Sequence, residues 1–174
     1  AGAAIGAVTG VGGLLLLLLP LAPVGTLLGY VDLRTRLLPR VVVIPATVAA
    51  LGYGVVAWPA SGDAEPLVRA LVGMAVAFAV FFVLWFIRSA GMGYGDVRLA
   101  AWLGFVLGHL GWAEYALGLY AGFLLFGVPG VLLAVVRRDR TLLKKAYPFG
   151  PFLLVGALLG ILLGDPLLGD LAVR

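Results

Sequence analysis

Long apolar runs separated by short polar segments make up most of this sequence. Each run is close in length to the roughly 20 apolar residues that a helix needs to cross the hydrocarbon core of a bilayer. The runs lie at residues 5–31, 41–58, 67–87, 97–112, 115–136 and 151–168. The pattern therefore predicts an all-α membrane protein, in which about six transmembrane helices form a single domain over residues 1–174.

The first run is the longest and contains Pro20 and Pro23. Because proline removes a backbone hydrogen bond from a helix interior, we expect this run to be either kinked or split there. No basic residue precedes Arg34, so the run lacks the charged start of a secretory signal peptide. We expect it to be a permanent span.

Composition agrees with a bilayer environment, because 63% of the residues are hydrophobic and only 11% are charged. The basic residues lie between the apolar runs and form no continuous stripe, so we expect lipid and not nucleic acid as a partner. Ten of the twelve Lys and Arg residues fall on one side of the predicted bundle. They are Arg34, Arg36, Arg40, Arg88, Arg98, Arg137, Arg138, Arg140, Lys144 and Lys145. The positive-inside rule makes that side cytoplasmic, which predicts a multi-pass protein of the inner membrane.

The chain has no cysteine and a single histidine, His109. This composition excludes disulfides, thiol catalysis and a zinc site with Cys ligands. His109 falls near the outer end of the fourth run, where we expect an interfacial residue. We therefore expect no metal and no cofactor.

Two acidic residues on the basic side, Asp32 and Asp96, lie at the edges of apolar runs. A carboxylate is costly to bury there, so each is a functional candidate, although neighbouring arginines could also neutralise it as an interfacial charge. Asp32 is followed, after five intervening residues, by Leu38 and then Pro39, which ends the helix. The alternating glycines before Asp96, which include Gly93 and Gly95, permit close backbone approach and positive φ. They place Asp96 at the start of the next helix, so the two carboxylates can meet.

At these residues the sequence resembles the type IV prepilin leader peptidases, a family of GxGD-type intramembrane aspartic proteases. The shared motifs are Asp-x5-[Ile/Leu]-Pro, Gly-x-Gly-Asp-x-[Lys/Arg]-Leu and a late Pro-Phe-Gly-Pro-Phe at residues 148–152. The resemblance implies that Asp32 and Asp96 are catalytic. It also implies that the chain cuts the leader peptide from prepilins or pseudopilins at the cytoplasmic face.

Other residues take their interpretation from these motifs. We expect Pro39, Gly93 and Gly95 to form active-site loops. The turn at Pro148, Phe149 and Gly150 either borders the substrate path or serves only to start the last helix.

The sequence departs from the family pattern in two places. Many members carry a cytoplasmic domain with paired Cys-x-x-Cys motifs that methylates the new N-terminus, whereas this sequence has no cysteine. We therefore expect no methyl transfer. Arg40 follows Pro39 where Asn or Asp is common.

Two carboxylates that share a proton let one activate water while the other protonates the substrate. The helix dipole favours Asp96 as the base, but Arg34, Arg36 and the coupling of the pair could reverse this assignment. A proton- or ion-coupled transporter subunit is an alternative, which would place the acids nearer mid-span and repeat broken helices in both halves. A second alternative is a non-catalytic assembly subunit that binds pilin helices.

Overall fold

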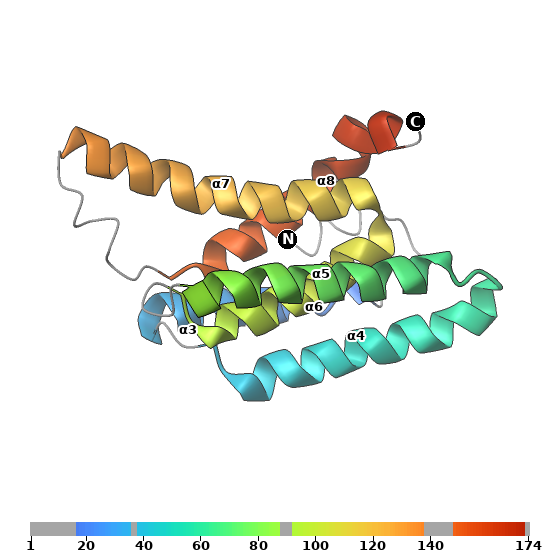
Figure 1. Ribbon diagram of the computed structural model, residues 1–174. Coiled ribbons are helices and arrows are strands. Elements are labelled where there is room, and N and C mark those ends of the chain that lie inside the picture. Colours follow the sequence, from blue (N-terminus) through green and yellow to red (C-terminus); the bar gives the residue numbers. More distant parts are fainter. Residues whose placement is uncertain (1–16, 36–37, 88–91, 138–147, 173–174) are drawn as a thin grey trace.

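Helices make up the architecture of this chain. A computed structural model describes residues 17–35, 38–87, 92–137 and 148–172, and these residues contain helices and no strand (Figure 1). The helices are α3 (Leu21–Thr35), α4 (Arg40–Ser61), α5 (Glu65–Ile87), α6 (Tyr94–Leu110), α7 (Trp112–Val136) and α8 (Gly150–Ala172). The predicted all-α class is confirmed, and the predicted runs from 41–58 onward each correspond to one helix.

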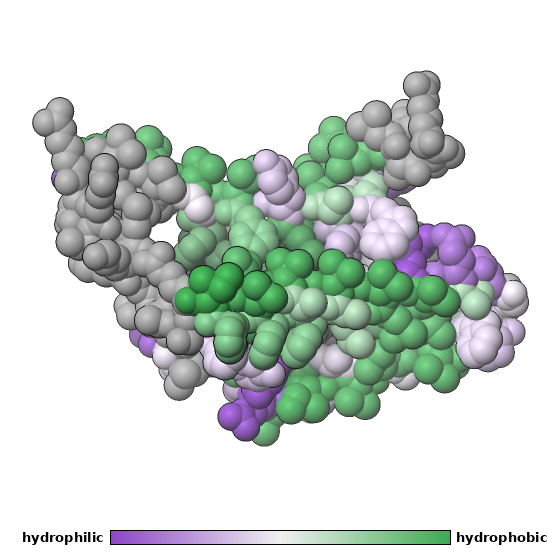
Figure 2. Space-filling view, in the orientation of Figure 1, coloured by the Kyte–Doolittle hydropathy of each residue, from purple (hydrophilic) through white to green (hydrophobic). Residues whose placement is uncertain are grey.

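Three of these helices are long and apolar enough to cross a membrane. The segments are Arg40–Pro59, Glu65–Ile87 and Gly150–Leu168. Their outer surfaces carry large apolar side chains, such as Val41 on α4 and Phe86 on α5, which are 82% and 75% exposed. Figure 2 shows this apolar surface as a green band over α5 and α4. A continuous apolar surface of this kind fits lipid and would be unfavourable in water, so the chain is a polytopic helical membrane protein.

The first predicted run is interrupted at Pro20. The helical residues Leu17 and Leu18 are followed by a turn, and α3 begins at Leu21. Pro23 lies in the first turn of α3, where its missing N–H leaves no hydrogen bond unmade. The run is therefore split at Pro20 in the part that the structure describes, while residues 5–16 lie outside that part.

Small residues allow the helices to pack closely. A Cβ added to Gly73 on α5 would lie 2.7 Å from the carbonyl oxygen of Gly104 on α6. On α8, a Cβ added to Gly156 would lie 2.6 Å from the carbonyl oxygen of Gly118 on α7. Such contacts bring two backbones together and are typical of helix packing in membranes. They fix α5 on α6 and α7 on α8.

The two ends of the bundle differ in chemistry. The end of α3 and the starts of α4, α6 and α8 lie at one end, at the left of Figure 1. Arg69 lies at the other end, where its Nε donates to the carbonyl oxygen of Gly108 at 2.8 Å and its NH2 donates to that of His109 at 3.1 Å. These bonds satisfy carbonyl groups in the last turn of α6, where a cation is also favourable for the helix dipole. The sequence motifs thus gather at the opposite end from Arg69.

Candidate active site

Asp32 lies in the last turn of α3 and is 4% exposed. Its Oδ2 accepts a hydrogen bond from the backbone N–H of Gly150, at 3.1 Å. Gly150 is the first residue of α8, and the first N–H groups of a helix have no partner within it. The positive end of the α8 dipole therefore stabilises a negative charge on Asp32.

Asp96 lies in the first turn of α6 and is 6% exposed. Its Oδ2 accepts a hydrogen bond from the N–H of Gly93 at 3.1 Å, while its own N–H donates to the Gly93 carbonyl oxygen at 3.0 Å. Its Oδ1 is buried and has no hydrogen-bond partner among the described residues. Leaving a charged oxygen unpaired in such a place is costly, so Oδ1 is the atom best suited to carry a proton.

Both carboxylates line one cavity of about 210 Å³ at this end of the bundle. The other lining residues are Leu38, Arg40, Gly93, Tyr94, Gly95 and Arg98. The guanidinium of Arg98 lies over the ring of Tyr94, 4.6 Å from its centroid. In the described ranges neither aspartate forms an ion pair with an arginine. The alternative interpretation of two interfacial charges neutralised by arginine therefore has no support in these ranges.

The electrostatics of the site favour one proton on the pair. Asp32 and Asp96 lie just outside the predicted spans 5–31 and 97–112. Burial raises the pKa of Asp96 to about 7, the negative charge of Asp32 adds to the rise, and the hydrogen bond from Gly93 opposes it. Burial also raises the pKa of Asp32, against the hydrogen bond from Gly150. Two neighbouring carboxylates that resist joint ionisation can hold a shared proton near neutral pH.

The predicted loop residues have distinct positions. Gly95 permits close approach, because a Cβ there would lie 2.7 Å from the Cβ of Leu38. Gly93 precedes α6 with a φ of −74°, so the positive φ expected for the glycines before Asp96 is not found at this position. Pro39 precedes α4, and its carbonyl oxygen accepts a hydrogen bond from Val42 at 3.1 Å.

The turn at residues 148–150 positions α8 against Asp32. Phe149 is 3% exposed, and its ring packs against three other aromatic rings. They are Phe81, Phe123 and Phe126. This packing anchors the start of α8, and Gly150 then reaches Asp32. A Cβ on Gly150 would lie 2.8 Å from Asp32 Oδ2, which explains the glycine.

The sequence alone does not pair Gly150 with Asp32, and it does not place Leu38, Tyr94 and Arg98 at the site. The available signal was the helix start predicted by the Pro-Phe-Gly-Pro motif, because helix starts stabilise anions.

The profile of the type IV leader peptidase family matches residues 19–164 of this chain. A prepilin leader peptidase/N-methyltransferase of Pseudomonas putida is 34% identical over 158 residues, which cover 86% of this chain and 50% of the relative. A protein of the same name from Aeromonas salmonicida is 32% identical over 146 residues, which cover 79% of this chain and 46% of the relative. The chain thus spans about half the length of these curated relatives.

No solved structure matches the chain. The family profile, however, covers most of the sequence and includes both aspartates together with α3 to α7 and most of α8. The chain belongs to the type IV leader peptidase family.

Proposed function

We propose that this chain is an aspartic endopeptidase of the membrane that cleaves the leader peptide of type IV prepilins or pseudopilins. The observation that carries the proposal is the shared cavity of Asp32 and Asp96, two buried carboxylates from different helices. Two neighbouring carboxylates, of which one has a raised pKa, can act as the general base and the general acid in peptide hydrolysis. The names of the relatives supply the substrate class.

In the mechanism that we propose, Asp32 is the general base and Asp96 the general acid. Ionised Asp32 takes a proton from a water molecule, whose oxygen attacks the scissile carbonyl carbon. Protonated Asp96 gives its proton to the carbonyl oxygen, which forms a neutral tetrahedral intermediate. The intermediate then collapses as the C–N bond breaks and the proton held by Asp32 passes to the leaving amine. One hydroxyl of the intermediate returns its proton to Asp96 as the C=O bond of the product carboxylic acid forms, so both aspartates regain their starting states.

The hydrogen bonds of the two carboxylates support this assignment. The N–H of Gly150 at the start of α8 favours the anion on Asp32, whereas Asp96 Oδ1 lacks any described partner and favours a proton. Considered by itself, the dipole of α6 favours an ionised Asp96, which is why the sequence alone favours Asp96 as the base. A second helix start, that of α8, favours the opposite assignment.

The distribution of charge supports a site that faces the cytoplasm in the inner membrane. Arg40 and Arg98 line the cavity. Arg34 follows Asp32 by two residues in the last turn of α3. The opposite end of the bundle carries Arg69, which is engaged by Glu65 at 2.7 Å and by α6 carbonyl groups. Under the positive-inside rule, the end with more of the described arginines, namely Arg34, Arg40 and Arg98, is the cytoplasmic one.

A transporter would use paired acids differently. It would place them near mid-span, whereas Asp32 and Asp96 lie in the last turn and the first turn of their helices. The test is to reconstitute the purified protein in liposomes with a prepilin and identify the products by mass spectrometry. A peptidase releases the leader and dissipates no proton gradient. Proton flux without cleavage would contradict the proposal and favour the transporter, while substrate binding without either would favour an assembly subunit.

A further inference from the structure

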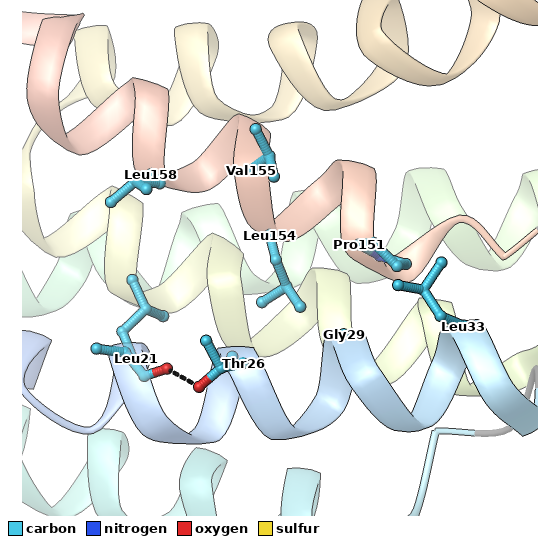
Figure 3. Close-up of a pocket in the computed structure, with 10 residues that line it drawn as sticks. Leu21, Thr26, Gly29, Leu33, Pro151, Leu154, Val155 and Leu158 are labelled. Atoms are coloured by element: carbon cyan, nitrogen blue, oxygen red, sulfur yellow. Dashed lines mark hydrogen bonds between the residues drawn. The ribbon is translucent and has the colours of Figure 1, made fainter. Parts of the chain in front are cut away.

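A second concave surface lies between α3 and α8. It is a groove of about 210 Å³ whose lining includes Leu21, Gly25 and Leu33 from α3 and Pro151, Leu154 and Leu158 from α8 (Figure 3). The polar side chain in it is Thr26, whose hydroxyl donates to the Ala22 carbonyl oxygen at 2.6 Å. Among its described lining residues, the groove therefore offers a ligand apolar contact and no free polar side chain.

Glycines make room for the groove on α3. A Cβ on Gly25 would lie 3.3 Å from Leu154 Cδ2, and one on Gly29 would lie 3.7 Å from Leu154 Cδ1. Leu154 thus lies close to the backbone of α3 near Gly29, as Figure 3 shows. The rim stays open, because Leu33 and Val155 are 61% and 49% exposed.

One end of the groove is formed by residues that directly follow Asp32 and Gly150 of the candidate active site, although the groove and the polar cavity share no lining residue. Leu33 directly follows Asp32, and Pro151 directly follows Gly150, whose N–H binds Asp32 Oδ2. From there the groove extends along α3 to Leu21, about 18 Å away at the rise of an α-helix. It therefore starts beside a carboxylate of the pair and runs into the apolar part of the bundle.

We propose that this groove binds the apolar, membrane-embedded segment of the substrate next to the scissile peptide. The inference rests on the proposed function. The polar cavity holds groups for the scissile bond, including Asp96 Oδ1, which has no described partner, while the described residues that line the nearby groove carry no charge. A single chain that fills both must join a polar peptide to an apolar stretch.

The length and shape of the groove specify the form of this segment. A helix of about 12 residues spans the distance from Leu33 to Leu21. Between helices in lipid, affinity comes from close packing against small residues, and Gly25 and Gly29 provide such a surface. The groove thus selects a helical apolar segment with the scissile peptide at its end.

Cross-linking tests this placement, since the chain has no cysteine of its own. Single cysteines replace Val155 near the middle of the groove or Leu158 at its far end, in an Asp96→Asn background that holds substrate uncleaved. Val83→Cys on α5, at a 52% exposed position, is the lipid-facing control. The probe is a prepilin with one cysteine about 4 or about 7 residues into its membrane-embedded segment, to match the distances of Val155 and Leu158 from Pro151 along α8.

We expect the nearer probe cysteine to cross-link to Val155→Cys and the farther one to Leu158→Cys, each at least about fivefold above the α5 control. Equal cross-linking at all three positions, or no dependence on the probe position, would overturn the proposal and leave lipid or residues 1–16 as the occupant.

Kinetics separate this inference from the proposed function. Val155→Trp, which fills the groove, should raise the KM for prepilin at least about fivefold while kcat stays within about twofold. Val83→Trp should change neither. If Val155→Trp cleaves prepilin with an unchanged KM, the proposed role of the groove is refuted and the proposed function stands. If the unaltered protein does not cleave prepilin, the proposed function is refuted.

Discussion

At the scale of single residues, the two candidate catalytic carboxylates differ in what holds them. Asp32 Oδ2 accepts the first N–H of α8, whereas Asp96 Oδ1 has no hydrogen-bond partner in the described part of the chain. Sequence motifs indicated these two acids as the candidates, because their positions at the edges of apolar runs are unusual. They did not predict the difference between the acids, since that depends on Gly150, a residue distant in sequence from both.

The shared proton predicts a pH dependence. Burial and the charge of Asp32 raise the pKa of Asp96 to about 7, so the proton leaves the pair as the pH rises through that region. We expect kcat/KM for prepilin cleavage to fall on the alkaline side with an apparent pKa near 7, and to fall again at acid pH when Asp32 is protonated. Circular dichroism at each pH controls for unfolding. A rate that kept rising above pH 8 would contradict an acid role for Asp96.

Gly150→Ala tests how α8 holds Asp32. The new Cβ would lie 2.8 Å from Asp32 Oδ2, so the carboxylate must move or its hydrogen bond must lengthen. We expect a loss of at least about 10-fold in kcat, because a small misplacement of a catalytic group is costly. Gly52→Ala on α4 is the matched control, since nothing lies within 4 Å of a Cβ there. Equal rates for the two variants would show that contact with Gly150 is unimportant.

At the scale of helices, the apolar runs predicted most of the elements. The structure was needed to locate two helix boundaries. The first run is split at Pro20, which the two prolines left open between a kink and a break. The fourth helix begins at Tyr94, three residues before the predicted start, because Gly93 and Asp96 form the reciprocal hydrogen bonds that cap it. Capping is local polar chemistry that a hydrophobic pattern does not record.

Helix packing gives a stability prediction. A Cβ on Gly156 of α8 would lie 2.6 Å from the Gly118 carbonyl oxygen of α7, and backbone atoms cannot yield as a flexible side chain can. We expect Gly156→Ala to lower the melting temperature in detergent by several degrees, about 3 °C for each kcal/mol lost. Gly127→Ala on α7, where the new Cβ meets nothing within 4 Å, should leave it unchanged or slightly raised. An unaltered melting temperature for Gly156→Ala would mean that α7 and α8 are packed less closely than described.

At the scale of the whole molecule, the fold brings four helix ends together around one polar cavity within an apolar bundle. The end of α3 and the starts of α4, α6 and α8 meet there (Figure 1). The spacing of the motifs predicted that both aspartates lie on one membrane face. It did not predict that α8 returns to them, because in a bundle the order of neighbours depends on packing between distant segments.

The proposed orientation can be tested by labelling in intact cells. Single cysteines at Thr35, on the end of α3, and at Gly62, after α4, probe the two ends of the bundle. An impermeant thiol reagent should label Gly62→Cys from outside and leave Thr35→Cys unlabelled until the membrane is opened, because basic loops stay cytoplasmic. The reverse pattern would place the cavity outside the cell.

The carboxylate pair itself is tested most directly by prepilin cleavage with Asp32→Asn and Asp96→Asn, each inserted and expressed like the unaltered protein. Each substitution removes one ionisable group and keeps the shape of the side chain. Asp165→Asn makes the same change at an exposed position on α8 and serves as the control. We predict a loss of at least about 100-fold for either member of the pair and a normal rate for the control. Near-normal cleavage by either Asp32→Asn or Asp96→Asn would contradict a catalytic pair.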